Sequence, residues 1–190
     1  LLPFEPPYFE RVGLDCAFVG HPVLEGGADK GEGRRFREQH GIPPEDNAIC
    51  VLPGSRSGEL KRLGEVLRQA ATTVAEKYPD AVYVFPTVSY LRVQVTELTK
   101  NWPGRTVVIS SISEKFDAMQ ACDVAMAASG TVSLELAMAR VPHLVAYRMN
   151  AFTVQIVKLL HGWNQKFVNL VNILLDREVI PEFIQEKCRG

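Results

Sequence analysis

Short apolar runs alternate along this chain with longer segments in which apolar and polar residues are mixed. Short runs that are almost entirely apolar predict buried strands, and these runs lie at 16–20, 48–54, 81–86, 106–110, 123–129 and 143–148. Longer segments with helical spacing or strong helix formers predict helices at 30–40, 58–77, 90–100, 114–121, 131–140 and 151–161. Apolar strands that alternate with helices are typical of a parallel sheet covered on both faces. The pattern therefore predicts an α/β fold, a single Rossmann-like domain with a doubly wound parallel sheet.

Composition and charge narrow the class of protein. The 190 residues suit one large domain with a sizeable core, and 46% of them are hydrophobic, as in ordinary globular proteins. A formal net charge of -1 gives no basic field, so we expect no nucleic-acid partner. The four cysteines are scattered without a C-x-x-C pair, which predicts reduced thiols in a cytoplasmic protein. No apolar run approaches the roughly 18 residues that cross a bilayer.

The loop after the apolar run 48–54 is the first candidate site. In doubly wound folds, ligands bind beyond the carboxyl ends of the strands. Here Pro53, Gly54, Ser55 and Arg56 join a strand to a long helix. Gly54 lets the backbone approach a ligand, the N–H groups around Ser55 favour an anion, and Arg56 offers a planar cation suited to phosphate. The alternative is an ordinary strand-to-helix turn with a solvated arginine.

The second candidate follows the apolar run 123–129. Ser129 or Thr131 can cap the next helix, and Gly130 again permits close approach. Glu135 lies four residues after Thr131, so it sits on the same helix face about one turn, roughly 5.4 Å, deeper. That separation suits the diphosphate and the ribose of a nucleotide, because a carboxylate can accept ribose hydroxyls. The alternative is a surface glutamate, although its apolar neighbours argue against a fully solvated face.

Two further loops reach the same edge of the predicted sheet. Arg148 ends the run 143–148, and Ile112 lies in the serine-rich loop after 106–110. A surface arginine and an ordinary loop are the alternatives. The four histidines form no spaced pair with each other or with a cysteine, and no D-x-D sequence occurs, so we expect no metal and no other cofactor. Backbone N–H groups and arginine would then meet the charge of a diphosphate.

Several sequence blocks follow one another in an order that points to one family. They are LPFEPPYFER, FVGHP, VLPGSRSGELKRL, ASGTVSLELA, VAYRMNAFT, FVNLVNILL and VIPEFIQEKC. In sequence and order these blocks resemble lipid-A-disaccharide synthase, a glycosyltransferase family of Gram-negative bacteria with the two-domain GT-B architecture. The resemblance covers essentially the whole chain. It implies that residues 1–190 are the C-terminal UDP-sugar-binding domain, without the N-terminal acceptor domain and an extreme C-terminal segment.

The resemblance also implies a reaction and its partners. The family transfers 2,3-diacylglucosamine from its UDP derivative to 2,3-diacylglucosamine 1-phosphate with inversion, and releases UDP. By this resemblance Arg56 and the two helix starts meet the leaving diphosphate, Glu135 binds the ribose, and the loop around Ile112 faces uracil. Asn172 is expected near the donor and His21 in the cleft. The family's proposed general base, an aspartate, belongs to the N-terminal domain, so this chain alone is expected to bind UDP weakly and to catalyse nothing.

The stretch 151–163 is apolar, with Lys158 as its lone charge, and it has two interpretations. It packs into the core or against a missing segment, or it touches the membrane surface or the acyl chains of the substrates. Its polar face is sparse for an interfacial helix, which favours packing. The second interpretation would make the protein a cytoplasmic one that is peripheral on the inner membrane.

Two rival functions stay open. Another GT-B enzyme on a UDP-sugar, such as a UDP-N-acetylglucosamine 2-epimerase or the N-acetylglucosaminyl transferase of peptidoglycan precursors, would share the fold and the role of Glu135. The YRMN and FVNLVN blocks favour the disaccharide synthase over these enzymes. The second rival is a non-catalytic nucleotide-binding module.

Overall fold

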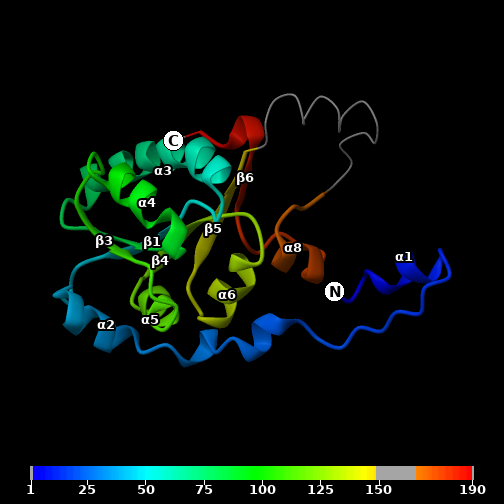
Figure 1. Cartoon of the computed structure of the whole chain (residues 1–190). Coiled ribbons are helices and arrows are strands. Elements are labelled where there is room, and N and C mark those ends of the chain that lie inside the picture. Colours follow the sequence, from blue (N-terminus) through cyan, green and yellow to red (C-terminus); the bar gives the residue numbers. More distant parts are fainter. Residues whose placement is uncertain (1, 149–165, 190) are drawn as a thin grey trace.

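The computed structural model describes residues 2–148 and 166–189, and within them six strands form one sheet (Figure 1). The strands are β1 (Ala48–Leu52), β2 (Val82–Pro86), β3 (Arg105–Ile109), β4 (Val124–Ala128), β5 (His143–Tyr147) and β6 (Glu182–Ile184). Their order across the sheet is β3-β2-β1-β4-β5-β6, and every neighbouring pair is parallel. This is the strand order of a doubly wound, Rossmann-like fold, so the predicted fold class is confirmed.

Helices cover both faces of the sheet (Figure 1). On one face lie α3 (Ser57–Lys77) and α4 (Arg92–Thr99), and on the other lie α2 (Gly33–His40), α5 (Lys115–Gln120) and α6 (Val132–Met138). Shorter elements are α1 (Pro6–Glu10), α8 (Leu170–Leu175) and the 3-10 helices η1 (Pro22–Glu25), η2 (Ala28–Lys30), η3 (Ser89–Leu91) and η4 (Gln185–Lys187). The two cores explain why the central strands are apolar without alternation: both of their faces are buried.

Five of the six predicted strands are confirmed, and the first is wrong. Residues 16–20 form no strand, and Phe18 and Val19 are 44% and 92% exposed, because the segment from α1 to η1 extends away from the sheet (Figure 1). The pattern also does not predict β6, a three-residue strand at the sheet edge. Five predicted helices form with slightly different bounds. The predicted helix 151–161 and the apolar stretch 151–163 lie outside the described residues.

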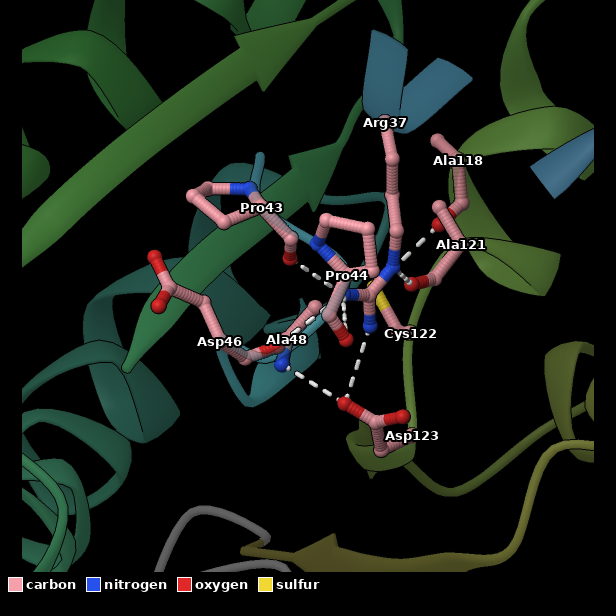
Figure 2. Close-up of polar contacts among 9 residues, drawn as sticks. All are labelled: Arg37, Pro43, Pro44, Asp46, Ala48, Ala118, Ala121, Cys122 and Asp123. Atoms are coloured by element: carbon pink, nitrogen blue, oxygen red, sulfur yellow. Dashed lines mark hydrogen bonds and ion pairs between the residues drawn. The ribbon is translucent and has the colours of Figure 1, made fainter. Parts of the chain in front are cut away.

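The amino ends of the central strands are held by one arginine (Figure 2). The guanidinium of Arg37, from α2, donates to the carbonyl oxygens of Ala121 at 2.7 Å, Pro43 at 3.0 Å and Asp46 at 2.9 Å. It also pairs with the Asp123 carboxylate at 3.0 Å, and the same carboxylate oxygen accepts the N–H of Ala48 at 2.8 Å. The Arg37 side chain is only 13% exposed. It therefore ties α2, the loop before β1 and the turn before β4 together, at the end of the sheet opposite the candidate site.

All four cysteines are free thiols, which confirms the prediction that no disulfide framework forms. Cys50, Cys122 and Cys188 are buried. Burial raises the pKa of the Cys122 thiol well above its usual range, so this side chain behaves as a small apolar residue in the core.

Candidate functional site

The two glycine-containing loops predicted as ligand sites meet at the centre of the sheet. β1 and β4 are neighbours, and their register pairs Leu52 with Ala127, so the loops 53–56 and 129–131 leave the sheet side by side. The chain then turns to opposite faces, into α3 after β1 and into α6 after β4. This is the topological switch point, where doubly wound sheets open a crevice beyond the strand ends.

In the first loop, the carboxylate of Glu59 from α3 accepts the hydrogen bonds that a ligand anion could accept. The Oε2 atom of Glu59 accepts the N–H of Ser55 at 2.9 Å, and its Oε1 atom pairs with the Arg56 guanidinium at 3.0 Å. Gly54 has a φ of +117°, and a Cβ there would collide with the Glu59 side chain, so the turn needs glycine. The loop therefore presents an N–H group and a cation to one anion, the arrangement that would also hold a phosphate oxygen.

The helix start after β4 differs in detail from the prediction. Thr131 stands at the N-cap position of α6, but neither a threonine nor a serine side chain caps the helix. The Ser129 hydroxyl instead donates to the Val168 carbonyl at 3.4 Å, which ties this loop to the segment before α8. The predicted side-chain cap is thus wrong, because tertiary contact draws the serine away. A Cβ on Gly130 would meet no atom within 4 Å, so space lies open above this residue.

Glu135 is partly buried and has a partner that the sequence does not predict. The N–H of Glu135 donates to the Thr131 carbonyl at 3.3 Å, which confirms the predicted spacing of one helical turn. Lys115, at the start of α5, contacts both carboxylate oxygens of Glu135, at 2.7 and 2.6 Å. This ion pair brings the loop after β3 beside α6. No signal in the sequence links two residues of opposite charge twenty positions apart.

Two of the other predicted site residues lie at the carboxyl edge of the sheet, and the third does not. Ile112 is 89% exposed in the loop after β3. Arg148 is exposed after β5, and its carbonyl accepts from the Arg62 side chain of α3 at 3.0 Å. His21 lies on the outer segment, where its Nδ1 accepts the Val23 N–H at 3.1 Å and caps η1.

Asn172 is fully buried, and its side-chain amide is used within the protein. Its oxygen accepts the N–H groups of Val179 at 2.9 Å and Ile180 at 3.0 Å, and its nitrogen donates to the Ile180 carbonyl at 2.8 Å and to Glu182 at 2.7 Å. Glu182 in turn accepts the N–H groups of Val168 and Asn169. Asn172 thus fixes the segment that contacts Ser129, and direct contact with a donor stays a prediction.

A buried serine–histidine pair lies beneath α6. The Nδ1–H of His143 donates to the Val141 carbonyl at 2.9 Å, so Nε2 is the acceptor that faces the Ser133 hydroxyl at 2.7 Å. Asn169 donates to the same hydroxyl at 2.6 Å. Ser133 and Asn169 are fully buried and His143 is 8% exposed. This buried hydroxyl therefore joins α6, β5 and the start of α8, and its burial and hydrogen bonds give it a structural role.

This pair predicts a pH dependence of stability. Burial lowers the pKa of His143, partly offset by its hydrogen bond to the Val141 carbonyl. The unfolded chain therefore binds a proton first, so stability is full above about pH 6.5 and falls as the pH drops from there toward the folded-state pKa. Urea unfolding at several pH values between about 7.5 and 5.5 measures this effect. The free energy of unfolding should change less with pH in His143→Gln than in the wild type. The same pH dependence in both proteins would contradict the conclusion that the His143 imidazole is buried in its neutral form.

The fold defines a class of protein, a Rossmann-like α/β domain in which the loops after β1 and β4 lie together at the switch point of the sheet. The family model for lipid-A-disaccharide synthetase matches residues 1–190, and the chain belongs to that family. It is similar to the lipid-A-disaccharide synthases of Rhodospirillum centenum (47% identity over 99% of this chain and 46% of the relative) and Paramagnetospirillum magneticum (44%, over 100% and 48%). The chain thus spans about half the length of these curated relatives.

Within residues 2–148 and 166–189, no three side chains of histidine, cysteine, aspartate or glutamate gather into a metal-binding group. No helix in this part of the chain has the length and apolar character needed to cross a membrane.

Proposed function

We propose that this chain is the donor-nucleotide-binding half of a glycosyltransferase of lipid A synthesis. The full-length protein would transfer 2,3-diacylglucosamine from UDP-2,3-diacylglucosamine to 2,3-diacylglucosamine 1-phosphate with inversion, and release UDP. The observation that carries this proposal is the juxtaposition of two loops at the switch point, with Glu135 one turn inside α6. The chain belongs to the lipid-A-disaccharide synthetase family, which supports this glycosyl transfer over the other reactions that Rossmann-like domains serve.

In the proposed mechanism, charge builds on the UDP diphosphate as the sugar–oxygen bond breaks. The Ser55 N–H and the Arg56 guanidinium would stabilise that charge, which requires Glu59 to release them. Glu135 would accept the ribose hydroxyls, and the exposed loop around Ile112 would face the base. The general base that activates the 6-hydroxyl of the acceptor is assigned to the other half of the protein. No metal is needed in this scheme, and the reaction would take place on the cytoplasmic side of the inner membrane.

Two substitutions test the donor site. Arg56→Ala and Glu135→Ala are each expected to weaken UDP binding about 10- to 100-fold, because a hydrogen bond to a charged group contributes about 1.5–3 kcal/mol. Arg34→Ala and Glu97→Ala are matched controls on exposed helix surfaces, with side chains 94% and 70% exposed. Calorimetry gives the affinities, and thermal unfolding checks that each variant is folded. Wild-type affinity in both site variants would refute the site.

The reaction itself is tested by product analysis. The full-length enzyme should form a β(1→6)-linked disaccharide from acylated UDP-glucosamine and acylated glucosamine 1-phosphate, and should leave unacylated UDP-N-acetylglucosamine unchanged. Epimerisation or transfer of the unacylated sugar would favour the rival GT-B enzymes, and UDP binding without turnover of either sugar would favour a binding module.

A further inference from the structure

The ion pair at the candidate site differs from the exposed pairs that lie along single helices, and like Arg37–Asp123 it joins two separate elements. The pairs Arg34–Glu38, Arg68–Glu65 and Lys100–Glu97 each join residues three or four positions apart on one helix. Lys115 and Glu135 instead join α5 to α6, and their side chains are 33% and 21% exposed. The Lys115–Glu135 pair is therefore a half-buried contact between two helices.

The geometry leaves Glu135 able to accept further hydrogen bonds. An ionised carboxylate has about four acceptor positions, two on each oxygen. The Lys115 ammonium uses one position on each oxygen, at 2.7 and 2.6 Å. The remaining positions suffice for two hydroxyl groups, so the lysine and a ribose can share the carboxylate.

The pair also restrains a flexible side chain. A free glutamate side chain populates several rotamers, and ordering it on binding has an entropic cost. Lys115 is itself placed next to the ring of Phe116, with Nζ 5.3 Å from the ring centroid. A lysine held at the start of α5 therefore orders the Glu135 carboxylate before any ligand arrives.

We propose that Lys115 is a positioning residue, which orients the Glu135 carboxylate for the 2′- and 3′-hydroxyls of the donor ribose. This inference rests on the proposed function, because it needs Glu135 to bind ribose. The alternative, in which the Lys115 ammonium binds the diphosphate directly, predicts a different dependence on the sugar hydroxyls.

The test compares UDP with 2′,3′-dideoxy-UDP in the full-length enzyme. Lys115→Met should weaken UDP binding about three- to tenfold, the equivalent of one side chain that must now be ordered on binding, and should leave 2′,3′-dideoxy-UDP binding unchanged. Lys115→Arg, which keeps a cation, should restore most of the UDP affinity. Lys100→Met is the matched control, because its ion pair with Glu97 lies on the exposed surface of α4, and it should bind both nucleotides as the wild type does.

Two results would overturn the inference while leaving the proposed function intact. One is wild-type UDP affinity in Lys115→Met, and the other is an equal loss for both nucleotides, which would assign the lysine to the phosphates or to the fold. If the wild-type enzyme does not bind UDP, or binds it no better than the dideoxy nucleotide, the proposed ribose site at Glu135 is itself refuted.

Discussion

Replacing Arg37 with alanine is expected to lower the free energy of unfolding by about 3 kcal/mol, although the residue lies far from the candidate site. The side chain is nearly buried, and its removal leaves the carbonyl oxygens of Ala121 and Asp46 without this donor (Figure 2). The Asp123 carboxylate loses its cation and keeps the N–H of Ala48. Water reaches Asp123, whose side chain is 56% exposed, so the loss is smaller than for a fully buried pair. Urea unfolding of the two proteins measures the difference.

Arg34→Ala is the control for this prediction. Arg34 lies on the same helix and pairs with Glu38, but its side chain is 94% exposed, so the change should stay within about 0.5 kcal/mol. Equal effects of the two substitutions would contradict the role given to Arg37 as the residue that joins α2 to the sheet.

Asn172→Ala is expected to destabilise the protein by a similar or larger amount, about 3–4 kcal/mol. The buried N–H groups of Val179 and Ile180 lose their acceptor, and each unsatisfied buried group costs about 1–3 kcal/mol. Leu174→Ala, on the same helix but 41% exposed, should have a much smaller effect. Urea unfolding gives the stabilities.

UDP titration of the folded fraction separates the two roles considered for Asn172. A structural role predicts lost stability with nearly wild-type affinity in the fraction that stays folded. Wild-type stability with strongly reduced affinity would contradict the structural role and favour direct contact with the donor.

The sequence predicts most of the fold because buried parallel strands leave a strong signal. Five apolar runs become strands: β1 and β2 are buried along their whole length, and β3, at the edge of the sheet, is partly buried. The run at 16–20 has the same composition, but a strand needs a partner, and nothing in a single run reports whether one exists. β6 shows the opposite case: its three residues pair with β5 although their local pattern is weak.

For the candidate site, the sequence predicts the loops but not the side-chain partners. Gly54 and Gly130 lie at the switch point because β1 and β4 are neighbours in the sheet, an order that the α/β alternation alone does not fix. The pairing of Glu59 with Arg56 could have been anticipated, because the two residues lie three positions apart at the start of a helix. The pairing of Lys115 with Glu135 could not, since it depends on how α5 and α6 pack.

The central claim is that UDP binds at the switch point through its diphosphate and its ribose. Calorimetric titration of the full-length protein with UDP and with UMP, with and without magnesium, tests this claim most directly. The account predicts UDP binding that does not depend on magnesium, with UMP markedly weaker, because the proposed site would hold the second phosphate with the loops at Arg56 and Gly130. Equal affinities for UDP and UMP, or binding only with magnesium, would contradict it.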